Sequence, residues 1–116
     1  MTIAEAAAAI GATPICGEDN MDKPITSGCG ADLMSDVLAF AKDGSILLTG
    51  MVNQHVIRTA EMLDVLCITF VRGKKPTEDI IDLAKQTGVT LLCCDLTLYE
   101  ACGKLYTQGL APCKRL

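Results

Sequence analysis

Four short segments of this sequence gather glycine, hydroxyl, amide and basic residues, which are the groups that bind a small anion. Basic side chains neutralise a phosphate, and backbone N–H groups at glycine turns or helix N-termini can cradle its oxygens. Each segment borders a short apolar run of the kind that forms a buried strand. The segments are Ser27-Gly28-Cys29-Gly30, Thr49-Gly50-Met51-Val52-Asn53, Arg72-Gly73-Lys74-Lys75 and Asp95-Leu96-Thr97.

In an open parallel α/β sheet, ligands bind beyond the carboxyl ends of the strands, and we predict a ligand site at that edge. Short strand-to-helix turns need glycine and capping residues in any protein of this class, so a purely structural interpretation of the segments stays open. The predicted ligand-binding residues are Ser27, Gly28, Thr49, Gly50, Asn53, His55, Arg72, Gly73, Lys74, Asp95 and Thr97.

Cys29 and His55 allow an enzymatic interpretation as well. A thiol in a glycine turn before a helix can have a lowered pKa and act as a nucleophile. His55 is the only histidine; in the first turn of a predicted helix it can act as a general base, and Asp36 is the acidic partner that such a site would use. No acidic residue stands beside His55 in the sequence, and we predict no catalytic residues.

Asp32 and Asp36 lie one helical turn apart in a predicted helix. Such a pair can bind a cation or do acid–base chemistry, but acidic residues in a first turn also complement the positive end of the helix dipole, and we favour this second interpretation. The sequence has no Gly-x-x-x-x-Gly-Lys-Ser/Thr and no Gly-x-Ser-x-Gly motif, which argues against a P-loop kinase and a serine hydrolase. We predict no metal site.

A strand, a glycine turn and a helix occur twice in succession, and these elements must position the four segments. Short apolar runs that end in glycine indicate strands buried on both faces, and their alternation with helical periodicity predicts parallel βαβ units. A third strand and helix follow, with Asp95 or Thr97 as the helix cap. The strands are predicted at 45–50, 66–73 and 88–94, and the helices at 53–63, 76–87 and 96–106.

Two further helices and two strands precede this unit. A helix at 3–10 is predicted to begin with Thr2 and Glu5 and to end at Gly11. The segment 13–17 reads as an edge strand, because Pro14 has no N–H to donate. A strand at 25–30 then leads to a helix at 32–42, whose predicted core-facing residues are Leu33, Val37, Phe40 and Ala41.

Length predicts one domain over residues 1–116, and the alternation of strands and helices predicts an α/β fold with a mostly parallel sheet flanked by helices. A net charge of -4 without a basic stripe argues against nucleic acid and an anionic membrane surface. The seven cysteines are odd in number and lack CxxC spacing, so we expect reduced, buried thiols and a cytoplasmic location. So many hydrophobic residues in so small a domain predict a homodimer.

Several stretches of the sequence resemble stand-alone DRTGG-domain proteins, which are similar to the amino-terminal domain of HPr kinase/phosphorylase. They are Gly30-Ala31-Asp32-Leu33-Met34-Ser35-Asp36-Val37-Leu38-Ala39, Leu48-Thr49-Gly50, Ile57-Arg58-Thr59-Ala60, Val71-Arg72-Gly73-Lys74-Lys75-Pro76 and Gly103-Lys104-Leu105-Tyr106. The resemblance implies a domain core at about 3–110. The residues that name the family differ here, since Gly50 is followed by Met51-Val52 and the next turn reads Val71-Arg72-Gly73. HPr kinase activity belongs to a separate P-loop domain.

The resemblance implies a non-catalytic regulatory domain that binds a small anionic ligand, with an adenine nucleotide as the ligand found where such domains regulate larger enzymes. It also implies a dimer or larger assembly. The alternative is a protein-interaction or accessory subunit without a small-molecule ligand, because similar stand-alone proteins are encoded with redox and hydrogenase systems.

Overall fold

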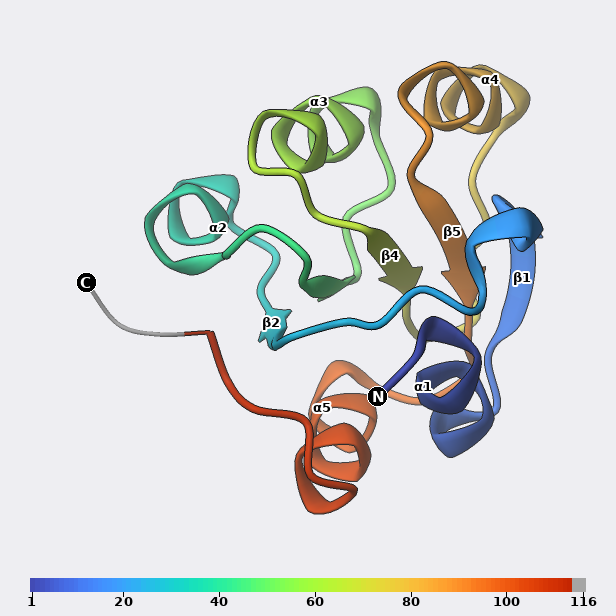
Figure 1. Cartoon of the computed structure of the whole chain (residues 1–116). Coiled ribbons are helices and arrows are strands. Elements are labelled where there is room, and N and C mark those ends of the chain that lie inside the picture. Colours follow the sequence, from blue (N-terminus) through green and yellow to red (C-terminus); the bar gives the residue numbers. More distant parts are fainter. Residues whose placement is uncertain (114–116) are drawn as a thin grey trace.

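A computed structural model describes residues 1–113 and shows a five-stranded sheet between two layers of helices. Figure 1 shows α2, α3 and α4 on one face of the sheet and α1 and α5 on the other. The elements are α1 (Ile3–Ile10), β1 (Thr13–Cys16), a short 3-10 helix (Glu18–Asn20), β2 (Gly28–Gly30), α2 (Met34–Phe40), β3 (Ile46–Thr49), α3 (Gln54–Met62), β4 (Cys67–Phe70), α4 (Glu78–Thr87), β5 (Thr90–Cys93) and α5 (Leu98–Thr107).

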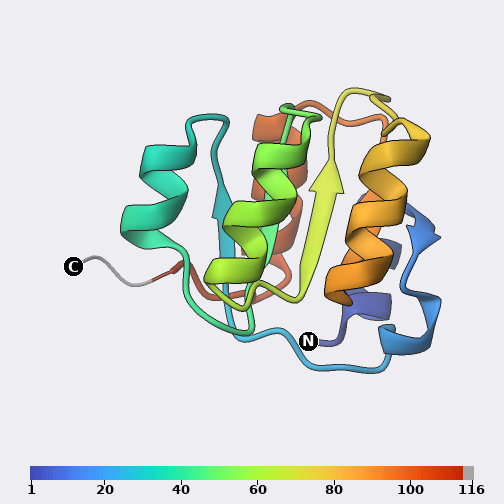
Figure 2. The ribbon, with the colours of Figure 1, turned by 90° about the horizontal axis from the view of Figure 1, so that it is seen from above.

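The strand order explains the two helical layers. The order is β1-β5-β4-β3-β2; β2 to β5 are parallel, and β1 is antiparallel at the edge beside β5. Each βαβ unit therefore moves one strand along the sheet in the same direction, and because such crossovers share one hand, their helices cover the same face. Figure 2 shows these three helices side by side across the sheet. The predicted α/β fold with a mostly parallel sheet is confirmed.

The central strands place apolar side chains on both faces of the sheet. In register across β3, β4 and β5, Leu47, Ile68 and Leu91 are fully buried under α2 to α4. The neighbouring positions Leu48 and Leu92 face α1 and α5 instead. Strands buried on both sides need continuous apolar runs, which is why these segments could be recognised in the sequence.

The first and last helices begin with matching capping boxes. At α1, Thr2 accepts a hydrogen bond from the Glu5 backbone N–H, and the Glu5 carboxylate accepts one from the Thr2 backbone. Thr97 and Glu100 do the same at α5, so of the two predicted caps it is Thr97, and not Asp95, that caps this helix. These reciprocal bonds satisfy backbone donors that a helix start leaves unpaired.

The predicted face of the helix after β2 is partly wrong. Leu33 is 63% exposed and Phe40 is 41% exposed, whereas Val37 is buried as predicted. The helix begins only at Met34, because Leu33 has an extended backbone before it. The buried stripe is therefore Met34, Val37 and Ala41. The strand predicted at 25–30 is also shorter, and only Gly28–Gly30 joins the sheet.

The described residues contain seven free cysteines, of which Cys16, Cys67 and Cys94 are buried. Burial raises the pKa of the Cys67 thiol to about 12. This thiol therefore acts as a small apolar side chain in the core. None of the helices in the described part of the chain is long and apolar enough to cross a lipid bilayer; the cytoplasmic location stays a prediction.

Cys67 should make the protein less stable as the pH rises above 9. The pKa of this thiol is about 12 in the folded protein, against an ordinary value of 9.0. Between these two pH values the thiol ionises only in the unfolded state, and this ionisation lowers the free energy of the unfolded state. This thiol should lower the free energy of unfolding by up to about 1.4 kcal/mol per pH unit there. In urea titrations from pH 8 to 11, Cys67→Ala should show a shallower decline than wild type. Ile68→Val, which truncates a neighbouring core residue without a titrating group, should keep the wild-type slope; equal slopes in all three proteins would contradict the prediction.

Candidate functional site

The turns that leave the four parallel strands meet at one edge of the sheet. The strands end at Gly30, Thr49, Phe70 and Cys93. The N-termini of α3, α4 and α5 lie at this same edge, because each helix follows its strand directly. The predicted site residues from Thr49 to Thr97 therefore lie at one edge of the sheet.

Asp32, from the turn after β2, binds the turn after β3. Its Oδ1 accepts a hydrogen bond from the Gly50 backbone N–H at 2.7 Å and another from the Thr49 hydroxyl at 3.2 Å. The Thr49 oxygen in turn accepts one from the Met51 N–H at 3.1 Å. The interpretation of Asp32 as a first-turn helical residue is wrong, because it precedes α2 and binds the neighbouring turn instead. Only Asp36 lies in the first turn of that helix.

Two basic side chains from the turn after β4 contact the same glycine. Lys74 Nζ donates a hydrogen bond to the Gly50 carbonyl oxygen at 2.9 Å. The Arg72 guanidinium lies so close to Gly50 that a Cβ atom there would be 2.7 Å from its Nη2. Position 50 must therefore be glycine if Arg72 is to keep this position.

The backbone holds the turn of Arg72 in place. Arg72 has a left-handed backbone (φ +59°), and its N–H donates to the Leu96 carbonyl oxygen at 2.8 Å. The Gly73 N–H donates to the Cys94 carbonyl oxygen, also at 2.8 Å. Within residues 1–113 the one salt bridge joins other side chains, so neither Arg72 nor Lys74 is paired with a carboxylate there. Two cationic groups are thus held at the strand ends with their charges available.

A cavity of about 490 Å³ opens beside this turn, between β5 and the antiparallel edge strand β1. Its polar wall contains Gly73, Lys75 and Asp95. A Cβ atom at Gly73 would lie 3.3 Å from Asp95 Oδ1, so glycine also allows the turn to approach this carboxylate. The remaining wall is mainly apolar and is formed by Gly11, Thr13, Pro14, Ile15, Pro76, Ile81, Cys93 and Cys94.

Two predicted site residues lie at the opposite end of the sheet. Ser27 precedes β2, and Gly28 pairs with Ile46, the first residue of β3. The prediction that they share an edge with Thr49 is wrong, because Ser27 and Gly28 lie at the start of β2 and not at its carboxyl end. Ser27 instead contacts the Cys113 thiol, with 3.4 Å between oxygen and sulfur.

Three other predicted residues lie at the carboxyl edge of the sheet, but two of them are engaged as helix caps and the third has no partner within residues 1–113. Asn53 accepts a hydrogen bond from the Val56 N–H and caps α3, and Thr97 caps α5. His55 is exposed in the first turn of α3, and its imidazole makes no hydrogen bond with a described residue. The interpretation of His55 as a general base therefore finds no orienting group in the described part of the chain.

Sequence reasoning missed Asp32 and the apolar wall of the cavity. Asp32 stands two residues after Gly30, at the end of a strand, and this placement was the available signal. The contribution of Pro14 and Ile15 had no signal, because it depends on β1 pairing with β5, a partner far away in the sequence.

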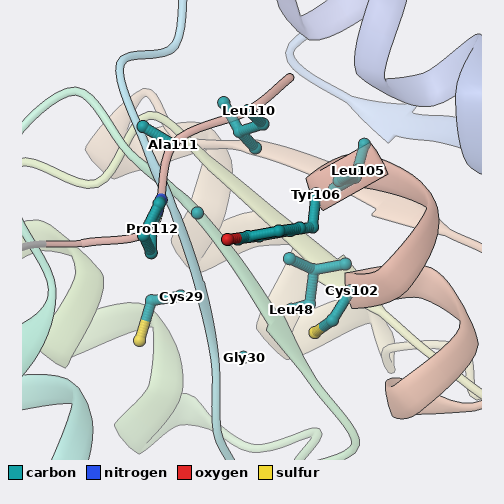
Figure 3. A pocket seen from close by; sticks show the side chains of 10 residues that line it. Cys29, Gly30, Leu48, Cys102, Leu105, Tyr106, Leu110, Ala111 and Pro112 are labelled. Carbon is teal, nitrogen blue, oxygen red and sulfur yellow. The ribbon is translucent and has the colours of Figure 1, made fainter. Parts of the chain in front are cut away.

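The glycines of β2 form the floor of a second cavity, about 280 Å³ in volume, between this strand and α5 (Figure 3). Tyr106 reaches across it toward Pro112. A Cβ atom at Gly30 would overlap with the Cys102 sulfur, so glycine permits the close approach of α5. The predicted lowered pKa of Cys29 is wrong: burial, with the neighbouring thiols of Cys113 and Cys102, raises it to about 11.

The geometry defines a class of protein, a three-layer α/β domain with a candidate anion site at the carboxyl edge of its sheet. In the described part of the chain, no three His, Cys, Asp or Glu side chains are arranged to hold a metal ion. No protein-family model matches the sequence, and the curated proteins contain no match to it.

Among solved structures, the chain is similar to the CBS and DRTGG domains of the regulatory region of Clostridium perfringens pyrophosphatase, complexed with the activator diadenosine tetraphosphate. The TM-score is 0.74 at 20% sequence identity, and the match covers 95% of this chain and 47% of that chain. The present chain thus spans about half the length of that structure. This likeness confirms the fold expected from the resemblance to DRTGG-domain proteins.

Removing the Asp32 carboxylate should loosen the turn that positions the basic residues. Asp32→Ala deletes two hydrogen bonds to the turn, and we expect a loss of about 1–2 kcal/mol in the free energy of unfolding, measured by urea titration. Asp36→Ala is the matched control, because it removes an exposed carboxylate from the first turn of α2 and should cost about 0.5 kcal/mol. Equal losses in the two variants would show that the Asp32 contacts contribute nothing.

Proposed function

We propose that this protein is a non-catalytic regulatory domain that binds an adenine nucleotide by its phosphates at the carboxyl edge of the sheet. The observation that carries the proposal is the placement of Arg72 and Lys74 against Gly50 without a carboxylate partner in the described residues. Cationic side chains held in this way bind phosphate oxygens through charge-assisted hydrogen bonds. The diadenosine tetraphosphate bound to the similar pyrophosphatase region supports a nucleotide as the ligand.

The phosphates are expected to contact basic side chains rather than the backbone of the Gly50 turn. The Gly50 N–H already donates to Asp32, so it is not available to an anion. Arg72 and Lys75 come from the same turn, and Lys75 lines the neighbouring cavity. The apolar wall of this cavity, which includes Pro76 and Ile81, gives the purine ring a surface away from water.

A regulatory role fits these side chains better than catalysis. Near neutral pH the Cys29 thiol is protonated, since its pKa is raised to about 11, and a thiol attacks poorly. Asp36 lies on α2 and lines one cavity with Cys29, but its charge is among the groups that raise the pKa of this thiol and so keep it protonated. Both residues are beside β2, at the opposite edge of the sheet from the cavity beside β1.

Binding can be tested by thermal unfolding of the reduced protein with ATP, AMP and diadenosine tetraphosphate. A ligand at 100 times its dissociation constant should add about 2.7 kcal/mol and raise the midpoint by several degrees. In Arg72→Ala/Lys74→Ala, the dissociation constant measured by calorimetry should rise at least about tenfold, since two charge-assisted contacts are lost.

The matched control is Arg58→Ala/Lys85→Ala, which removes the same charge from exposed positions on α3 and α4. It should bind as wild type does. If both double variants lose affinity equally, the ligand responds to net charge and not to this turn. If no nucleotide shifts the midpoint, the proposed ligand class is wrong.

A second candidate function, protein interaction, is favoured by two exposed tyrosines on one side of α5. Tyr99 is 89% exposed and Tyr106 is 68% exposed, and their spacing places them on one side of the helix. Large exposed apolar groups that gather on one face mark interaction sites. We propose that this face forms a homodimer; an accessory role beside a redox-system protein would use the same face.

Sedimentation equilibrium tests the dimer. The wild-type protein should sediment as a dimer, and Tyr99→Ser/Tyr106→Ser should raise the dimer dissociation constant at least about tenfold, because buried aromatic anchors carry much of an interface's energy. Met62→Ser, at a position 73% exposed on α3, should leave the constant unchanged. A wild-type protein that stays monomeric at all concentrations would contradict the proposal.

A further inference from the structure

The outer edge of β2 is paired with a segment that follows α5. The Gly28 N–H donates to the Ala111 carbonyl oxygen at 2.9 Å, and the Cys113 N–H donates to the Gly28 carbonyl oxygen at 3.2 Å. Gly28 and Pro112 form a parallel bridge through these bonds. The segment therefore lies in register along the strand, as a short additional strand would.

This register brings Cys113 beside Cys29. Each stands one position after the bridged pair, and neighbouring strands lie about 4.8 Å apart, within the Cα separation that a disulfide tolerates. The Cys113 thiol is also 3.4 Å from the hydroxyl of Ser27, which is two residues before Cys29 and so faces the same side of the strand. In addition, the Cys113 thiol is among the groups that raise the pKa of Cys29.

Cys102 is near the same strand but lies on its other side. Gly30, which alternates with Cys29, is the residue that faces the Cys102 sulfur. In Figure 3 the β2 ribbon runs between Cys29 and Cys102. The two thiols that can meet without crossing the strand are therefore Cys29 and Cys113.

A small reagent can reach this pair. Both cysteines are partly exposed, and both line a cavity of about 330 Å³ whose wall also includes Asp36 and Phe40. The cavity faces α2, away from the basic turn at Gly50, so chemistry here does not use the residues of the proposed nucleotide site.

We propose that Cys29 and Cys113 are a site of reversible oxidation, at which a disulfide ties the segment after α5 to the edge of β2. With a neutral low-molecular-weight disulfide as the oxidant, the Cys113 sulfur attacks one of its sulfurs and forms a mixed disulfide, and the first small thiol leaves with the proton from Cys113. The Cys29 sulfur then attacks the mixed disulfide at the Cys113 sulfur. The second small thiol leaves with the Cys29 proton, so two protein thiols are oxidised and one small disulfide is reduced to two thiols.

The bond would control access to this edge of the sheet. An edge strand presents N–H and C=O groups that another strand can pair with. While the segment is bound, the outward groups of Gly28 are occupied. Under oxidising conditions the disulfide would hold the segment against β2 covalently. After reduction, the segment would be held to the strand by the two hydrogen bonds alone.

The test uses the reduced full chain in buffers of oxidised and reduced 2-mercaptoethanol, followed by acid quenching, alkylation of free thiols and peptide mapping by mass spectrometry. Wild-type protein should lose two alkylation sites and yield a peptide pair that links Cys29 to Cys113. The oxidised protein should unfold several degrees higher, because the bond closes most of the chain into a loop.

Cys113→Ser and Cys29→Ser should each abolish the link, whereas Cys102→Ser, a cysteine on the other side of β2, should keep it. Thermal unfolding of the reduced variants checks that each one folds. The proposal is overturned if Cys29 and Cys113 of the wild-type protein are both still free for alkylation in every buffer, or if the wild-type protein instead links Cys29 to Cys102.

Discussion

The peptide unit at Gly50 is the constraint on which the candidate site depends. Its N–H is bound by Asp32 from the turn after β2, its carbonyl by Lys74 from the turn after β4, and its open face by the Arg72 guanidinium. Three consecutive strand ends are thus connected through one residue. A larger side chain at position 50 would displace the guanidinium, and the three turns would lose the contacts that hold them together.

The two helical layers depend on a related constraint at β2. Gly28 and Gly30 have no side chains on the face toward α5, and their absent Cβ atoms leave room for Leu110 and Cys102. The helix can therefore lie directly on the strand backbone. Close approach at glycine, rather than any single polar contact, sets the distance between α5 and this edge of the sheet.

Much of the fold could be predicted from the sequence, because its signals are local. The apolar runs that became β3, β4 and β5 and the caps at Thr2 and Thr97 follow from neighbouring residues alone. The candidate site could be predicted only in part. Arg72 and Lys74 were recognised as basic turn residues, but their convergence on Gly50 depends on the strand order, which no local pattern specifies. Cys29 was mistaken for a turn thiol because its strand is short and rich in glycine, which is also the composition of a turn.

The strand order also has a consequence for synthesis on the ribosome. β2 to β5 are added one after another along the sheet, and α2, α3 and α4 cover one face as they emerge. The opposite face is closed by α1 and α5, elements from the two ends of the described chain. Domains fold as units during translation, at roughly 5–20 residues per second. A nascent chain that has completed β5 therefore has α1 but not α5 for the opposite face, and the apolar residues that pack against α5 in the complete domain are still exposed at that stage.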